Sequence, residues 1–150
     1  MGISLSTCLQ NIQNEYDLEK KLLIITSFCR SAYNPEKLLD QLDKNLIYEW
    51  ALKYPLDALI DGSEYLDDDI LFHCAELFPT KAVLSKGYLI KVKNTSLFEK
   101  LLEKCDSLLA LAYWGPYMLE NRKDLFEMHA KNAPQFAKER FGFSHGLVSI

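Results

Sequence analysis

Apolar residues recur at helical spacing along most of the chain, and one pattern of them occurs four times. In each copy a leucine or isoleucine is followed by a small or apolar residue five and twelve positions later. A proline stands nine positions after the leading residue in three copies, and an aspartate stands there in the third copy. The leading residues are Leu46, Ile70, Leu97 and Leu125. One such segment cannot bury its own apolar face, so the pattern predicts stacked helical units that share a core.

Each copy is typical of a helix, a turn and a second helix. The segment 70–78 carries apolar residues at helical spacing, and the proline that follows it suits the first turn of a new helix. Alanines at the fifth and twelfth positions let the two helices approach closely. A glycine then ends each second helix, where we expect a left-handed cap, and aromatic residues follow it. The four glycines are Gly62, Gly87, Gly115 and Gly142.

These elements predict the organisation of the whole chain. The expected fold class is all-α, a short α-solenoid of stacked helix-turn-helix units with atypical terminal caps. In the N-terminal cap we expect a helix from about Asp17 to Tyr33 and another from Glu36 to about Asp43, and the units begin behind Asp67 to Asp69, Asn94 to Ser96 and Asp124 as N-cap residues. Residues 1–150 then form one domain, with a cap at 1–45 and repeat units at 46–69, 70–96, 97–124 and 125–150. The period drifts through 24, 27 and 28 positions, so four independent amphipathic hairpins are the alternative.

Over residues 46–143 the chain resembles the short α-helical repeat proteins of the HEAT-like and leucine-rich-variant class. The resemblance rests on the frame of leucine or isoleucine, alanine, proline and alanine, with glycine and an aromatic residue afterwards. It implies a protein that acts by binding, commonly on the concave side lined by the second helix of each pair. The copy that begins at Leu97 departs from the frame, with leucines in place of both alanines, so we expect its helices to lie further apart.

Composition agrees with one compact domain in the cytoplasm. The chain is 49% hydrophobic and 25% charged, which is too apolar for disorder. No apolar stretch approaches the roughly 20 residues that a bilayer span needs, and no basic flank followed by an apolar segment opens the chain. The cysteines form no CxxC pair, so we expect reduced, mostly buried thiols at Cys8, Cys29, Cys74 and Cys105.

Charge is unevenly distributed along the sequence. Residues 36–76 hold eleven acidic residues and three lysines, a net charge of −8, whereas residues 77–104 hold six lysines and two glutamates, a net charge of +4. An acidic end that adjoins a basic belt can steer and orient a partner. The alternative is a solvated face with N-cap aspartates. The expected partner-binding residues are Asp57, Asp61, Glu64, Asp67 and Asp68 in the acidic region and Lys91 and Lys93 in the basic belt.

The aromatic segment 113–118 is a further candidate for partner binding. Trp114 and Tyr117 flank Gly115-Pro116, and a turn there would hold both rings at the surface as a binding hot spot. The alternative is that the two rings close the core beneath the irregular third unit.

Signatures of catalysis are missing from the sequence. The histidines His73, His129 and His145 show no metal-binding spacing, and there is no phosphate loop or nucleophile motif. We expect His129 to occupy a half-buried position in its helix. A pI near 5.4 disfavours nucleic acid as a partner. We therefore expect a protein that is not an enzyme and that uses no cofactor and no metal.

The first six residues match the pattern for N-myristoylation at Gly2, with Cys8 as a conceivable second acyl site. The alternative is that Gly2 is simply the second residue. Together these features favour a small acidic protein-binding module that neutralises a basic partner, similar to the immunity proteins that block bacterial toxins. The alternative function is a host-delivered effector or a membrane-associated adaptor, with membrane contact only if Gly2 is acylated.

Overall fold

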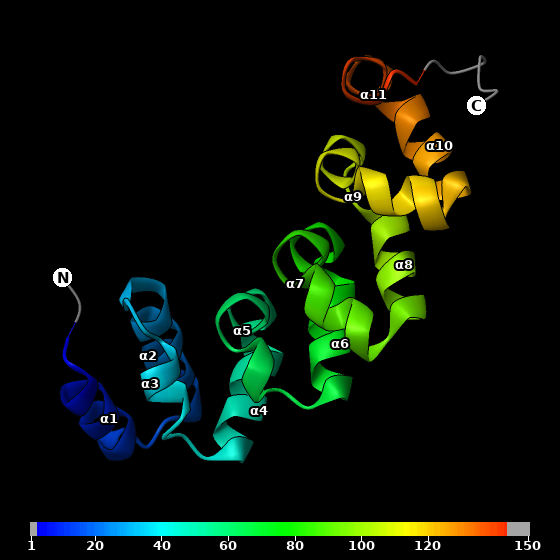
Figure 1. The fold of residues 1–150 in the computed structure, drawn as a ribbon. Coiled ribbons are helices and arrows are strands. Elements are labelled where there is room, and N and C mark those ends of the chain that lie inside the picture. Colours follow the sequence, from blue (N-terminus) through cyan, green and yellow to red (C-terminus); the bar gives the residue numbers. More distant parts are fainter. Residues whose placement is uncertain (1–2, 144–150) are drawn as a thin grey trace. The chain divides into compact units, whose positions relative to one another are not determined.

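The computed structural model describes residues 3–143, and over this range it contains helices and no strand (Figure 1). The prediction of an all-α fold is confirmed. The chain divides into two compact units, Met1–Phe78 (unit 1) and Pro79–Ile150 (unit 2). The division falls inside the expected repeat unit 70–96, between its two helices. The single domain of stacked repeats stays a prediction, and each unit is described separately below.

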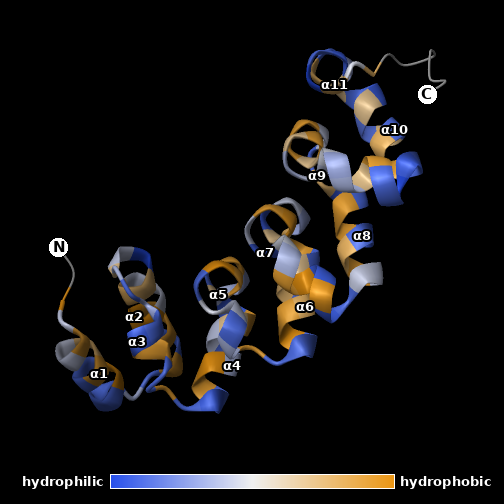
Figure 2. Cartoon of the chain, viewed as in Figure 1, coloured by the Kyte–Doolittle hydropathy of each residue, from blue (hydrophilic) through white to orange (hydrophobic). Residues whose placement is uncertain are grey.

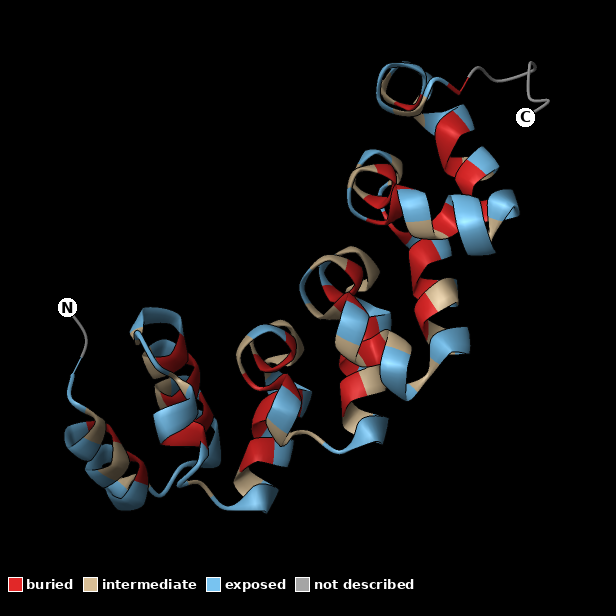
Figure 3. Ribbon diagram, viewed as in Figure 1, coloured by how far each residue is buried: buried red, intermediate tan, exposed pale blue. Residues whose placement is uncertain are grey.

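Unit 1 has its helices packed around a core to which each of them contributes one face. Helix α2 packs against α1, α4 and α5, and α4 packs against α5 and α6. Apolar residues gather on the buried faces, as comparison of Figure 2 with Figure 3 shows. The elements are α1 (Leu5–Asn14), α2 (Leu18–Ser31), α3 (Glu36–Leu39), α4 (Lys44–Lys53), α5 (Pro55–Asp61), the short 3-10 helix η1 (Ser63–Tyr65) and α6 (Asp68–Leu77).

The two helices expected in the N-terminal segment are present. Helix α2 begins directly after Asp17, whose carboxylate accepts a hydrogen bond from the backbone N–H of Glu19. Helix α3 is shorter than expected and ends at Leu39. The reason is that Asp43 has extended backbone angles and serves as the N-cap of α4, so the chain has only three residues in which to leave one helix and begin the next.

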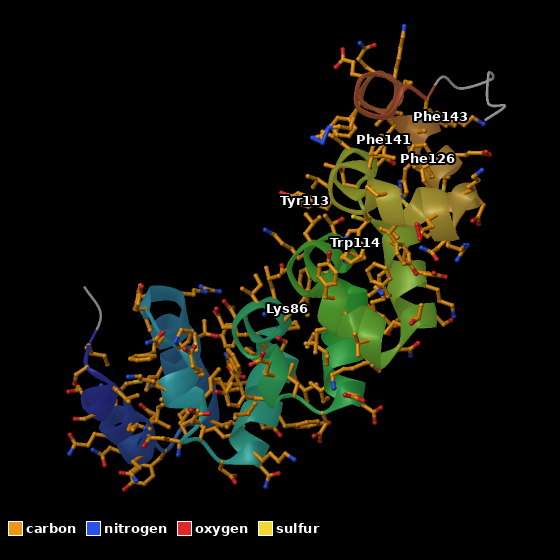
Figure 4. All side chains as sticks on the ribbon, in the orientation of Figure 1. Lys86, Tyr113, Trp114, Phe126, Phe141 and Phe143 are labelled. Atoms are coloured by element: carbon orange, nitrogen blue, oxygen red, sulfur yellow. The ribbon has the colours of Figure 1, made fainter. Side chains whose placement is uncertain are left out.

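Over its described residues, unit 2 contains five helices. Helix α7 packs against α8 and α9, and α9 packs against α10 and α11. The rings of Phe126, Phe141 and Phe143 form edge-to-face pairs that close its C-terminal part (Figure 4). Ile150, the last residue of the expected unit 125–150, lies outside the described residues. The helices are α7 (Pro79–Lys93), α8 (Thr95–Lys104), α9 (Ser107–Asn121), α10 (Lys123–Asn132) and α11 (Pro134–Phe141).

Three helix junctions share one backbone conformation. Tyr54, Phe78 and Ala133 have φ between −125° and −135° and ψ between 62° and 67°. Each precedes a proline, and a proline disfavours the helical conformation in the residue before it. The expected role of proline at the start of the second helix is therefore confirmed.

The irregular third copy makes its junction differently. Its Asp106 caps α9 by accepting a hydrogen bond from the backbone N–H of Leu109, and α9 starts one position later than the proline-led helices. The position that is buried in the core also shifts by one residue. Leu109 is only half-buried, whereas Ala110 next to it is fully buried like Ala58, Ala82 and Ala137 at the twelfth position of the other copies.

The expectation for the four glycines was wrong at three positions. The left-handed backbone forms only at Gly142 (φ 66°). Gly62 does end α5 as expected, but with φ −123°. Gly87 directly follows a kink in α7 at Lys86 (φ −129°, ψ 21°), and Gly115 lies inside α9. Aromatic rings explain these three positions. Trp50 packs onto Gly62, Trp114 onto Gly87 and Phe141 onto Gly115, each so closely that a Cβ atom would collide with the ring.

Two further local expectations are corrected. The segment around Pro116 is part of helix α9 and does not form a turn, although Pro116 cannot donate the usual helical hydrogen bond. Helix α10 begins at Lys123 with Arg122 as its N-cap, so Asp124 lies in the first turn. The guanidinium of Arg122 binds the carboxylate of Asp124 through two hydrogen bonds.

We expect a larger side chain at Gly87 to destabilise unit 2. A Cβ atom there would lie 2.6 Å from Cζ2 of Trp114, so Gly87→Val must displace the indole ring. The matched control is Ser85→Val, which adds the same side chain at an exposed position of α7. Denaturant unfolding should show Gly87→Val to be about 2–3 kcal/mol less stable than the control, as overpacked cores are. Equal stabilities would contradict the close packing of this helix against Trp114.

Candidate functional site

A groove of about 350 Å³ lies in unit 1, between the C-terminal end of α3, the start of α4 and η1. Its apolar lining comes from Leu39, Leu42, Ile47 and Leu66. Its polar lining comes from Asp40, Lys44, Glu64, Tyr65 and Asp67. Three of those five polar side chains are carboxylates, so we call this feature the acidic groove.

The rim of the acidic groove is ordered by two polar contacts. The hydroxyl of Tyr65 donates a hydrogen bond to Oδ1 of Asp40 at 2.6 Å. This bond to a carboxylate raises the pKa of Tyr65 to about 12. Lys44 lies 3.5 Å from Asp67, and both side chains are largely exposed, so this pair is weak and exchangeable. Glu64 is exposed at the same rim.

The two units carry opposite net charges. Unit 1 holds fourteen acidic and six basic residues, a net charge of −8. Unit 2 holds seven acidic and eleven basic residues, a net charge of +4. The change of sign that the sequence places after Glu76 therefore coincides with the structural boundary after Phe78. The acidic groove lies in the unit whose charge reinforces it.

The structure separates the expected acidic contacts into two groups. Glu64 and Asp67 line the groove, and Asp68 follows them at the start of α6. Asp57 instead accepts two hydrogen bonds of 2.9 Å from the guanidinium of Arg30 on α2. Asp61 lies one helical turn further along α5, and its charge contributes to the raised pKa of the Cys29 thiol, which is due first to burial. Asp57 and Asp61 thus share the α5 face toward α2 and do not join the groove.

Trp114 is part of the core of unit 2. Its side chain is 7% exposed and is surrounded by the rings of Tyr88, Phe98 and Tyr117, with centroids 4.7–5.7 Å away (Figure 4). Its indole N–H donates to the carbonyl of Val83 at 3.1 Å. Of the two alternatives drawn from the sequence, the structure therefore places Trp114 in the core, and the exposed turn is wrong.

Tyr117 belongs to a polar network that the sequence analysis did not find. Its hydroxyl donates to Glu99 at 2.6 Å, and Arg122 binds the other oxygen of Glu99 at 2.9 Å. Burial and the hydrogen bond to Glu99 raise the pKa of Tyr117 to about 12. Hydrogen bonding by Arg122 lowers the pKa of Asp124. The ammonium of Lys91 lies 5.4 Å from the ring centroid of Tyr117, and Lys93 is exposed in the last turn of the same helix.

His129 is fully buried, not half-buried as expected. Its Nε2 lies 2.9 Å from the carbonyl oxygen of Leu102, and its Nδ1 lies 2.8 Å from the hydroxyl of Ser107. Because a carbonyl only accepts, Nε2 carries the proton in this arrangement. The ring ties the end of α8 to the start of α9, where the third copy lacks its proline. Both ring nitrogens are therefore used by the fold.

The four cysteines are buried thiols, as expected. Burial raises the pKa of each, to about 12 for Cys29 and about 11 for Cys74, which suppresses the reactive thiolate. Cys8 is 0% exposed, so it is a poor acyl acceptor. Met1, Gly2 and His145 lie outside the described residues. Between residues 3 and 143, no group of three or more histidine, cysteine or acidic side chains could hold a metal ion.

Comparison with known proteins gives no significant match: no family model, no curated protein and no solved structure resembles the chain. In the described part of the chain, no helix is both long and apolar enough to cross a membrane. The groove geometry and the charges of the two units are therefore the basis for a functional proposal.

Two tyrosines should ionise late in an alkaline titration. Of the eight tyrosines, Tyr65 and Tyr117 have a pKa of about 12 in the folded chain, against about 10 when unfolded. A raised folded pKa means that their hydrogen bonds stabilise the fold below pH 10 and lose this effect between about pH 10 and 12. We expect the ultraviolet absorbance of phenolate to show a fraction of the tyrosines that ionises late, at a pH where circular dichroism still reports folded protein. Tyr65→Phe should remove half of it.

The matched control for this titration is Tyr16→Phe, at a side chain that is 96% exposed. This variant should leave the late fraction unchanged. A late fraction that survives both Tyr65→Phe and Tyr117→Phe would show that the two carboxylate contacts do not form in solution.

Proposed function

We propose that this chain is a protein-binding module and that the acidic groove of unit 1 receives a basic segment of the partner protein. The observation that carries the proposal is the combination, in one groove, of apolar walls and a carboxylate rim on a unit with a net charge of −8. The function of the module is to occlude the partner, in the manner of a small acidic neutraliser. It acts without catalytic chemistry of its own.

The lining of the groove fits a lysine or arginine side chain. Such a side chain has an apolar stem and a charged end, and it buries the first while keeping the second near water or a carboxylate. Leu42, Ile47 and Leu66 offer the apolar contact, and Glu64 and Asp67 offer the charge. Lys44 holds Asp67 at a separation of 3.5 Å and can be displaced by the incoming cation, because both side chains are exposed.

The net charge of unit 1 favours association with a basic partner before the groove itself is contacted. A net charge of −8 attracts a basic partner over distances comparable with the Debye length and raises the rate of association. The groove then adds local contacts to this general attraction, because apolar and acidic side chains line it together. We further propose that the helical pairs of the chain stack as a short α-solenoid, the architecture that presents such surfaces in helical repeat proteins.

Neutralising the rim should weaken binding of a basic peptide. The variant Glu64→Gln with Asp67→Asn keeps the shape of the groove and removes two carboxylates. The probe is a fluorescent decapeptide with three arginines and three leucines, and fluorescence anisotropy gives the Kd. We expect the Kd to rise about fivefold, equivalent to about 1 kcal/mol for two exposed charge contacts, and its salt dependence to decrease.

The matched control is Glu49→Gln with Glu76→Gln, which makes the same change in net charge at exposed positions of unit 1 outside the groove. A decapeptide with glutamate in place of arginine tests the sign of the charge. If the groove variant and the control lose the same affinity, general attraction accounts for binding and the groove does not.

A further inference from the structure

A small hollow continues the acidic groove between α4 and the start of α6. It has a volume of about 20 Å³, room for little more than one water molecule. Its lining combines two tyrosines, two apolar residues, one lysine and one carboxylate, and we call it the tyrosine hollow. It shares with the acidic groove Lys44, Tyr65, Leu66 and Asp67, and it adds Tyr48 and Ile70.

The two tyrosines of the hollow are placed by different elements. Tyr48 lies one turn after Lys44 on the same side of α4 and is 46% exposed. Tyr65 comes from η1, and its hydroxyl donates to Asp40 at the end of α3, which fixes the ring. Aromatic rings attract a cation that reaches their faces. A cation that enters the hollow therefore meets aromatic side chains and the carboxylate of Asp67 together.

The chain already places a cation of its own at this point. The ammonium of Lys44 lies 3.5 Å from Oδ1 of Asp67, and the two side chains are 78% and 73% exposed. An ion pair that is so exposed contributes little to stability and exchanges readily with other ions. Lys44 therefore occupies the position at which a cation of the partner would bind Asp67.

The ion pair between Lys44 and Asp67 favours one incoming cation over another. A lysine of the partner would replace one ammonium at Asp67 by another, so this exchange gains nothing in that contact. An arginine gains more, because its planar guanidinium forms two parallel hydrogen bonds with a carboxylate and stacks on aromatic rings. The hollow is too small for a guanidinium while Lys44 lines it, so entry requires Lys44 to move out.

We propose that the tyrosine hollow is an arginine subsite of the acidic groove and that Lys44 makes this subsite selective against lysine. The inference rests on the proposed function, because the arginine belongs to the basic segment that the groove receives. Its apolar stem lies against Leu66, which lines both features. Its guanidinium binds Asp67 and stacks on Tyr48, and the ammonium of Lys44 turns to water.

The first test measures selectivity with the full chain. Two fluorescent decapeptides differ only in carrying three arginines or three lysines, and fluorescence anisotropy gives the Kd of each. We expect the arginine peptide to bind about fivefold more tightly. Lys44→Arg keeps the net charge and should reduce this preference to less than about twofold, because residue 44 then makes the same hydrogen bonds and stacking contact within the chain.

The matched control for Lys44→Arg is Lys53→Arg. Lys53 lies on the same helix, outside both the groove and the hollow, and its ammonium is 3.7 Å from Glu19 in another exposed pair. This variant should keep the full preference for arginine.

The second test removes one aromatic ring. Tyr48→Leu keeps an apolar side chain at a half-exposed position, so the fold should persist, which circular dichroism checks. The Kd of the arginine peptide should rise about threefold, and that of the lysine peptide should rise less. The control is Tyr33→Leu, at a side chain that is 98% exposed and lines neither the groove nor the hollow, and it should leave both Kd values unchanged.

The outcomes separate the subsite from the proposed function. Equal Kd values for the two peptides, or a preference that survives Lys44→Arg, would overturn the arginine subsite. If the peptides bind equally and Glu64→Gln with Asp67→Asn still weakens both, the acidic groove receives basic segments and only the subsite is wrong. If neither peptide binds, the subsite and the proposed function both fail.

Discussion

Close approach of helices is the constraint on which both units depend. The fifth-position residues Ala51, Ala75 and Ala130 are 0% exposed, and three glycines each lie against an aromatic ring. The methyl group of alanine lets two helices approach each other where a larger side chain would hold them apart. The hydrogen atom of glycine lets an aromatic ring contact the backbone directly. Glycine inside a helix costs about 1 kcal/mol relative to alanine, so at Gly115 inside α9 the close packing of Phe141 offsets this loss.

The sequence could predict the helices and their junctions because these are local. Proline restricts the residue before it, and Tyr54 and Ala133 accordingly have almost the same backbone angles. The sequence could not assign the glycines, because a cap and a close contact select the same residue. What distinguishes them is an aromatic ring that lies 12 to 27 residues away in the sequence, such as Trp114 over Gly87. The irregular third copy is similar, since Ala110 replaces Leu109 in the core only once Asp106 has fixed the start of α9.

The candidate site follows the same division between local and distant information. Composition identified the acidic region, and Glu64 and Asp67 do line a groove there. Composition could not show that Arg30, 27 residues earlier, already pairs with Asp57. Nor could it indicate that His129 holds the ends of two other helices. Whether a charged or polar side chain is free to bind another protein depends on residues that are distant in the sequence and that the fold brings near it.

The two tryptophans are distributed one to each unit, and each is buried with its indole N–H bonded. Trp50 donates to the hydroxyl of Thr26 at 2.6 Å in unit 1, and Trp114 donates to the carbonyl of Val83 in unit 2. Each unit thus contains a single tryptophan, and its indole is shielded from water. With either indole replaced, the emission of the other reports the loosening of one half of the molecule alone, without any external label.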